Sequence, residues 1–180
     1  IFAGMGRTLD VSRERHLTLV SRLQRPMYRP GDECLYSNSN YMLLSLLIER
    51  ISGKTLRDFM REELFEPLGM ASTVLIPDMA EVVPRKARGY VPGETGKMHT
   101  GLTLYEVSGD GGVDTTIADM VLWFGHYRRA TVPVSGYRER MEAETRLNDG
   151  TVSSYRLGIN VTRYRGLRKV SHPGGMAGYL

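Results

Sequence analysis

The segment LYSNSNYMLLSLLIER, residues 35–50, constrains the fold more than any other part of the chain. Its second half is almost wholly apolar and predicts a helix, with Asn38 or Ser39 as the N-cap and Gly53 as the stop. Because the apolar positions lie nearly all round the helix axis, we expect a central, buried helix. Capping accounts for one asparagine at the helix entrance, but it does not account for Tyr36.

The rest of the chain predicts helices first and strands last. The other predicted helices combine amphipathic spacing with capping residues, and they cover residues 10–24, 55–67, 113–130 and about 135–146. Residues 72–112 have no sustained period and predict a long irregular excursion. Two strands, 155–164 and 167–172, are predicted to meet at a turn at Arg165–Gly166. This order indicates an α+β fold of single-domain size.

Charge and composition limit the partners and cofactors. The net charge is +4, but no run of five or more like charges occurs, so solvated basic faces are favoured over a nucleic-acid partner. The longest apolar run is too short for a membrane span. Four scattered histidines and the single Cys34 predict no zinc site, no cofactor and no intrachain disulfide, and they leave the compartment open. Cys34 is expected to be a small buried residue rather than a nucleophile. The GDGGVD stretch lacks the lysine of a phosphate loop and predicts a tight turn.

Four stretches occur in a particular order: Tyr36-x-Asn38, PLGM after the next helix, GDGGVDTTIADM, and His172-Pro-Gly174. This ordered set resembles the superfamily of serine β-lactamases and penicillin-binding proteins. The resemblance is strongest to its class C-like branch, with D,D-carboxypeptidases, D-aminopeptidases and related esterases, and it covers about residue 25 to the end. It implies a β-lactamase/transpeptidase-like fold, of which these residues supply mostly the helical lobe and the beginning of the antiparallel sheet.

The resemblance implies a role for five residues. Tyr36 faces the reacting centre, where nearby positive charge favours the phenolate that takes a proton from a serine hydroxyl and returns it to the leaving group. Asn38 orients a substrate amide. His172 takes a place often held by lysine, where it binds a substrate carboxylate or the tyrosine oxygen. Gly174 leaves the strand open to the substrate, and the backbone N–H of Gly175 is an oxyanion-hole donor. Without the resemblance, Tyr36 is a half-buried loop aromatic and Pro-Gly-Gly merely ends a strand.

One departure from the family pattern bears on activity. No serine of the chain has a lysine three residues on; Ser52 is followed directly by Gly53 and Lys54. We therefore expect residues 1–180 to be a partial domain that lacks the N-terminal Ser-x-x-Lys segment and the C-terminal strands. Such a chain is expected to be inactive alone and to associate through an exposed sheet edge.

The parent protein is expected to be a serine hydrolase that cleaves an amide or ester of a small molecule or peptide through an acyl-enzyme. His172 in place of lysine favours a peptidase or esterase over a β-lactamase. The alternative hypothesis is a non-catalytic binding module of the same fold that recognises peptidoglycan-like peptides. A Ser-x-x-Lys upstream in the gene favours the enzyme, and its absence favours the module.

Overall fold

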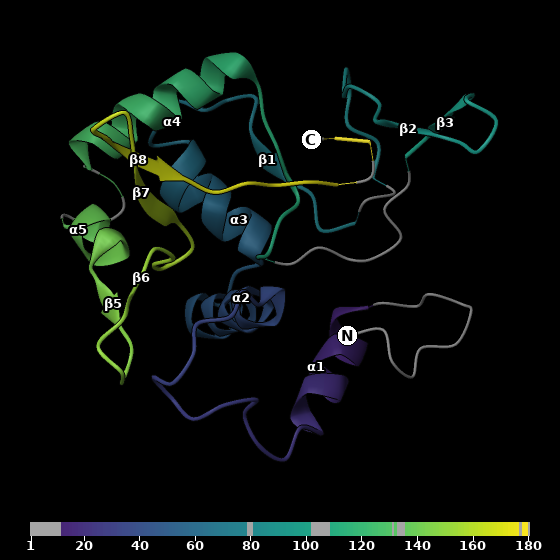
Figure 1. Ribbon diagram of the computed structural model, residues 1–180. Coiled ribbons are helices and arrows are strands. Elements are labelled where there is room, and N and C mark those ends of the chain that lie inside the picture. Colours follow the sequence, from purple (N-terminus) through teal and green to yellow (C-terminus); the bar gives the residue numbers. More distant parts are fainter. Residues whose placement is uncertain are drawn as a thin grey trace.

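The computed structural model describes residues 12–78, 81–101, 109–130, 132, 136–176 and 178–179. The helices are α1 (Arg13–Ser21), α2 (Asn38–Ser52), α3 (Leu56–Met60) with its π-helical continuation η1 (Arg61–Phe65), α4 (Ile117–Arg129) and α5 (Tyr137–Glu142). The strands are β1 (Val74–Leu75), β2 (Tyr90–Pro92), β3 (Met98–Thr100), β4 (Val113–Asp114), β5 (Thr145–Arg146), β6 (Val152–Ser153), β7 (Asn160–Tyr164) and β8 (Leu167–Ser171). In Figure 1, α2 lies near the centre below α3, α4 crosses the top, and α1 and the β2–β3 hairpin lie at the periphery.

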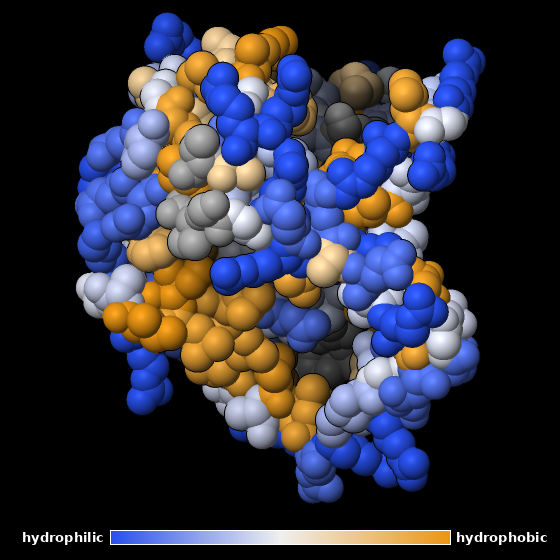
Figure 2. All heavy atoms as spheres, turned by 90° about the vertical axis from the view of Figure 1, so that its left-hand side faces the viewer, coloured by the Kyte–Doolittle hydropathy of each residue, from blue (hydrophilic) through white to orange (hydrophobic). Residues whose placement is uncertain are grey.

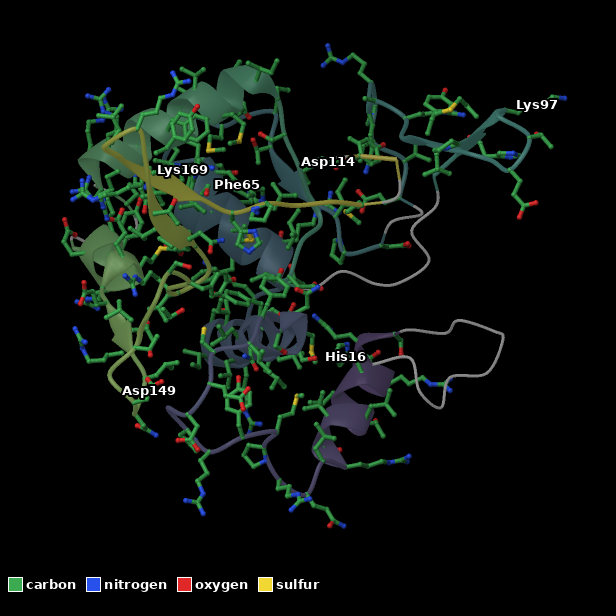
Figure 3. The ribbon with its side chains drawn as sticks, in the orientation of Figure 1. His16, Phe65, Lys97, Asp114, Asp149 and Lys169 are labelled. Atoms are coloured by element: carbon green, nitrogen blue, oxygen red, sulfur yellow. The ribbon has the colours of Figure 1, made fainter. Side chains whose placement is uncertain are left out.

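The strands form small antiparallel sheets, so the architecture is mixed α and β. Within the described residues each sheet has two strands: β1–β4, β2–β3, β5–β6 and β7–β8. The sequence predicts an irregular segment over residues 72–112. The two ends of this segment lie side by side in the β1–β4 pair, where Leu75 pairs with Val113. That segment is less irregular than predicted, since it also contains the β2–β3 hairpin, which carries Lys97 at its turn (Figure 3).

Helix α2 ends where the sequence predicts and begins one residue away from the prediction. Gly53 adopts a left-handed conformation with φ of 70°, and its N–H donates to the carbonyl of Glu49 at 2.9 Å. The N-cap is Ser37, not Asn38 or Ser39, because Ser37 has the extended backbone of a cap while Asn38 is already helical. The side chain of Asn38 is thereby free for another use.

The burial of α2 differs from the prediction of a helix buried all round. Met42 and Ser45 are its buried residues, whereas Leu44, Leu47 and Ile51 are 49%, 52% and 84% exposed. Helices α1 and α3 both contact α2, yet within the described part of the chain they leave these three apolar side chains exposed. Apolar exposure of this kind also appears on the face shown in Figure 2, where a broad hydrophobic area lies among hydrophilic side chains.

Helix α1 is attached to α2 by polar contacts. The guanidinium of Arg13 donates to both carboxylate oxygens of Glu49, at 2.9 and 3.0 Å. Nε2 of His16 lies 2.9 Å from Oγ of Ser39, and Figure 3 shows His16 on α1 beside α2. Glu49 also accepts from the backbone N–H of Leu56 at 2.9 Å. One carboxylate therefore connects α1, α2 and the first turn of α3.

The helix predicted from residue 55 begins there, with Thr55 as its N-cap, whereas the helix predicted from residue 113 begins only at Ile117, because residues 113–114 form β4. Thr55 accepts from the N–H of Asp58 at 3.1 Å and donates to its carboxylate at 2.7 Å, which is a weaker form of the capping box. Thr116 caps α4 by accepting from the N–H of Asp119 at 3.2 Å. The predicted helix at 135–146 is shorter, since α5 ends at Glu142 and Thr145 begins β5.

The core gathers around α2, α3 and β1. Its buried apolar residues, among which Figure 3 labels Phe65, are Met42, Leu56, Phe65, Met70, Leu75 and Ile76. Buried Asp119 fastens α4 to this core, because its carboxylate accepts from the N–H of Ser72 at 2.8 Å and the hydroxyl of Thr73 at 2.7 Å. Within the described residues, no helix is both long and apolar enough to cross a membrane.

The C-terminal hairpin matches its predicted turn but not its predicted start. Arg165 and Gly166 have φ of 49° and 79°, and Tyr164 pairs with Leu167 across them. Strand β7 begins at Asn160 rather than at residue 155, because the chain turns at Gly158, where φ is 77°. Tyr155 instead bridges to Asn160 as an isolated pair. This turn aims residues 155–158 toward α2.

Candidate active site

A solvent-open hollow of about 420 Å³ lies where four separate segments of the chain meet. The segments are the entrance of α2, the turn before β4, the turn before β7 and the residue after β8. The lining residues are Tyr36, Asn38, Tyr41, Gly109, Asp110, Tyr155, Gly158 and His172. Three of the five residues given roles by the family resemblance are therefore neighbours in space, although His172 is far from the other two in sequence.

A clamp from the β5–β6 hairpin holds the extended segment before Tyr36. The side-chain amide of Asn148 donates to the carbonyl of Pro30 at 3.1 Å and to the carboxylate of Asp32 at 2.8 Å. Its backbone N–H donates to the carbonyl of Gly31 at 2.8 Å. Asp149, labelled in Figure 3, marks the turn of this hairpin. The clamp brings the segment that leads to Tyr36 beside the residues that precede Tyr155.

Three rings meet on one side of the hollow. The ring centroid of Tyr36 lies 5.8 Å from that of Tyr155 and 5.7 Å from that of His172. The rings of Tyr155 and His172 lie 6.0 Å apart at 63°, and the Tyr155 hydroxyl lies 3.2 Å from Nε2 of His172. These are edge-to-face and tilted arrangements, which are favourable for aromatic rings. A phenol and an imidazole are thus placed together at the helix entrance.

Tyr41 forms the floor of the hollow and depends on two glycines. It follows Asn38 by three residues, so both side chains lie on the same face of α2. A Cβ atom on Gly158 would lie 2.6 Å from the Tyr41 hydroxyl, and one on Gly109 would lie 2.7 Å from the Tyr41 carbonyl oxygen. Only glycine permits these approaches. The two turns therefore close on α2 because they lack side chains at these positions.

The phenols of Tyr41 and Tyr155 have raised pKa values. For Tyr41 the causes are burial and the nearby Tyr36, partly offset by a hydrogen bond with Tyr155. For Tyr155 burial again raises the pKa most, followed by the proximity of Tyr41 and Tyr36. A phenol with a pKa above its ordinary value of about 10 keeps its proton at neutral pH. Both hydroxyls are therefore hydrogen-bond donors under ordinary conditions.

The polar groups of the hollow include an acceptor without a partner. Oδ1 of Asn38 is buried and accepts no hydrogen bond within the described part of the chain. Leaving such an acceptor unpaired costs about 1–3 kcal/mol, so a ligand that donates to it gains that amount. Among the described lining residues, Asp110 contributes a carboxylate. The hollow therefore contains a hydrogen-bond acceptor and a carboxylate.

The structure places the remaining predicted residues elsewhere. Gly174 is exposed with open space where a Cβ would lie, and Gly175 is exposed as well; neither belongs to the lining. Cys34 is exposed, so the expectation of a buried cysteine was wrong. No group of three or more metal-ligating side chains occurs among the described residues.

Sequence reasoning missed five of the lining residues: Tyr41, Gly109, Asp110, Tyr155 and Gly158. Tyr41 had a usable signal, because its spacing of three from Asn38 puts it on the same helix face. Gly109 was assigned to a tight turn, and its positive φ of 84° agrees with that. Nothing in the local pattern of Tyr155 or Gly158 indicates that they pack against α2.

Comparison with known proteins places these observations in a family. The model of the beta-lactamase family matches residues 8–180. D-aminopeptidase from Brucella anthropi is 28% identical over 166 residues, which are 92% of this chain and 32% of that protein. D-aminopeptidase from Brucella ovis is 27% identical over 161 residues, 89% of this chain and 31% of that protein. The chain spans about a third of the length of these relatives.

Solved structures agree on the fold. The octameric penicillin-binding protein homologue from Pyrococcus abyssi superposes with a TM-score of 0.78 at 23% identity, over 95% of this chain and 40% of that one. D-amino acid amidase from Ochrobactrum anthropi SV3 superposes with a TM-score of 0.64 at 22% identity, over 84% of this chain and 47% of that one. The fold is therefore the β-lactamase/transpeptidase-like fold of these neighbours. The match over nearly the whole chain shows that it belongs to the beta-lactamase family.

Proposed function

We propose that the hollow is the proton-transfer and substrate-binding side of an acyl-transfer site, in a serine hydrolase that cleaves amides or esters. The observation that carries the proposal is the meeting of Tyr36, Asn38 and His172 in one hollow, together with the buried Oδ1 of Asn38, which has no hydrogen-bond partner among the described residues. These residues come from opposite ends of the chain, and their meeting supports the roles that the family resemblance implies. In this proposal the chain supplies mostly the helical lobe and the first part of the sheet.

In the proposed reaction, a serine of a Ser-x-x-Lys motif outside these residues attacks the substrate carbonyl. Tyr36 acts as the general base that takes the serine proton and later returns it to the leaving group. Asn38 accepts a hydrogen bond from a substrate amide, and His172 binds a substrate carboxylate or the Tyr36 oxygen. The N–H of Gly175 remains the predicted oxyanion-hole donor, and Gly174 keeps its approach open.

For the substrate we propose an amide or peptide with a free ammonium group next to the scissile bond, a D-amino-acid derivative in particular. Asp110 supports this choice, because a carboxylate in the lining attracts a cation. The D-aminopeptidase relatives support the stereochemistry. A β-lactam is a less favoured substrate, because a neutral imidazole at position 172 holds a carboxylate less well than a lysine ammonium does.

The proposal is tested by the substitution Tyr36→Phe in the gene product that contains these residues. Tyr164→Phe is the matched control, since Tyr164 is an exposed tyrosine on β7 outside the hollow. D-alanyl amides, short acyl esters and nitrocefin serve as substrates. We expect Tyr36→Phe to slow acyl transfer by about 10²–10⁴-fold and the control to leave it unchanged. Near-normal turnover of Tyr36→Phe would remove Tyr36 from the mechanism. Rapid nitrocefin hydrolysis without amidase or esterase activity would overturn the substrate ranking.

A non-catalytic binding module is the second candidate function, because no Ser-x-x-Lys occurs in the sequence. In that case the same hollow binds a peptidoglycan-like peptide without cleaving it. The sequence of the gene upstream of Ile1 decides between the two. If the gene has no Ser-x-x-Lys there, and its product binds a D-alanyl peptide without hydrolysing it, the hydrolase proposal is wrong and the protein is a binding module.

A further inference from the structure

Tyr155 lines the hollow but has no part in the proposed reaction. Its ring centroid lies 5.8 Å from that of Tyr36 and 6.0 Å from that of His172, with interplanar angles of 77° and 63°. Aromatic rings attract one another in such edge-to-face arrangements. Tyr155 therefore packs against two of the residues that the proposed function uses.

The backbone of Tyr155 is held on both sides. Its N–H donates to Oγ of Ser153 at 3.1 Å, and Tyr155 forms an isolated β-bridge with Asn160. The turn that follows is closed by the N–H of Arg156, which donates to the carbonyl of Ile159 at 2.8 Å. These bonds fix the point from which the Tyr155 side chain enters the hollow.

The other two rings lie on less regular backbone and are more exposed. Tyr36 is 59% exposed and belongs to residues 33–37, which form neither helix nor strand. His172 is also exposed, and it follows the last residue of β8. An exposed side chain has several rotamers open to it unless a neighbour selects one of them. Tyr155, which is only partly exposed, is therefore the member of the three that is able to orient the others.

We propose that Tyr155 is a positioning residue, whose ring holds the phenol of Tyr36 and the imidazole of His172 in the orientation in which they face the hollow. Losing one aromatic pair lowers the ratio of positioned to displaced rings by about 2- to 12-fold, which corresponds to about 0.5–1.5 kcal/mol. The inference rests on the proposed function for its effect on catalysis, but the placement of the rings is measured without any substrate.

The test is the proximity of the three rings in the chain, read from nuclear Overhauser cross-peaks between their ring protons. The signals are assigned with the variants Tyr36→Phe and His172→Gln. In the wild type we expect cross-peaks from Tyr155 to both other rings and between Tyr36 and His172. Tyr155→Leu removes the ring and should weaken the Tyr36–His172 cross-peak. Tyr155→Phe keeps the ring and should restore it.

The control is Tyr164→Leu, which removes the ring of an exposed tyrosine on β7 and should leave the cross-peaks unchanged. A Tyr36–His172 cross-peak of unchanged strength in Tyr155→Leu would overturn the proposal, as would an equal loss in Tyr155→Leu and Tyr155→Phe. If Tyr155→Leu does not fold, the wild type decides, because a spectrum without cross-peaks from Tyr155 to the other two rings overturns the proposal.

The effect on catalysis is measured in the gene product with a D-alanyl amide. We expect Tyr155→Leu to lower kcat by about 2- to 12-fold and Tyr155→Phe to restore it, because the ring and not the hydroxyl orients Tyr36. A general loss of folded enzyme would not be reversed by the phenyl ring while the cross-peaks return with it. Rings placed as proposed, together with a fully active Tyr36→Phe enzyme, would reject the proposed function and leave the positioning of the rings standing.

Discussion

The contact between the GDGG turn and α2 is most readily tested by a substitution at Gly109. Its φ is 84°, and a Cβ placed on it would lie 2.7 Å from the carbonyl oxygen of Tyr41 and 2.8 Å from Cβ of Ser45. Both are atoms of α2 that cannot move away without moving the helix. We therefore expect Gly109→Ala to strain the backbone and to separate the turn from the helix.

Gly53→Ala is the matched control, because Gly53 has a similar φ of 70° but nothing lies within 4 Å of its added Cβ. A left-handed alanine costs about 1–2 kcal/mol at either position. Overpacking against backbone adds about 1–3 kcal/mol at Gly109 only. The free energy of unfolding should thus fall by about 1–3 kcal/mol more for Gly109→Ala than for Gly53→Ala.

The assay is urea unfolding of the chain and both variants, followed by circular dichroism. The slope against denaturant should stay the same while the midpoints separate, since the change acts on stability and not on the surface exposed. Equal midpoints for the two alanine variants would refute the reasoning. They would mean that the turn does not lie on α2, and that Asp110 does not line the hollow.

Four further predictions follow from the same contacts. Asp119→Ala should lower the free energy of unfolding by about 2–4 kcal/mol in urea unfolding, because two hydrogen bonds to a buried carboxylate are lost. Tyr41 and Tyr155 have folded pKa values above the unfolded value of about 10, so their stabilisation is complete below pH ~10 and is lost as pH rises through the folded pKa. Unfolding free energies measured between about pH 9 and 11.5 should therefore decline, and less steeply in Tyr41→Phe. In the gene product, Asp110→Asn should lower kcat/KM for a D-amino-acid amide by about tenfold and leave an uncharged ester unaffected. The open edges of the β7–β8 hairpin should make the chain associate, as a concentration-dependent mass in size-exclusion chromatography with light scattering; a constant monomer mass would refute this.

The elements that rest on local chemistry were predictable from the sequence. The stop at Gly53, the cap at Thr55 and the turn at Arg165–Gly166 each depend on residues within a few positions of one another. The N-cap of α2 was misplaced because Ser37, Asn38 and Ser39 are all good caps. The backbone conformation of Ser37, which the side-chain types do not reveal, decides among them.

Burial was less predictable, because it depends on what packs against each face. The apolar residues of α2 predict a helix covered on all sides, yet Leu44 and Leu47 face solvent in the described structure. A periodicity argument identifies surfaces that are able to pack, and it cannot supply the neighbour. The prediction that Cys34 is buried was wrong for the same reason, since the apolar character of a cysteine does not reveal that it lies in an exposed loop.

The site was partly predictable from the order of the family motifs along the chain. Tyr36, Asn38 and His172 were expected together, and all three line the hollow, whereas Gly174 and Gly175 lie outside the lining. Their chemical roles remain predictions. The other lining residues come from turns whose closeness to α2 is a long-range property. No spacing rule connects Tyr155 with Tyr41 across more than a hundred residues.

The measurement that tests the central claim most directly is covalent labelling by a fluorophosphonate, read by intact-mass spectrometry and peptide mapping. The claim is that Tyr36, Asn38 and His172 serve a nucleophile that these residues do not contain. We predict no adduct on this chain alone, and a single adduct in the gene product, on the serine of a Ser-x-x-Lys motif. A stoichiometric adduct on any serine of this chain, or a gene product that stays unlabelled despite having the motif, would contradict the claim.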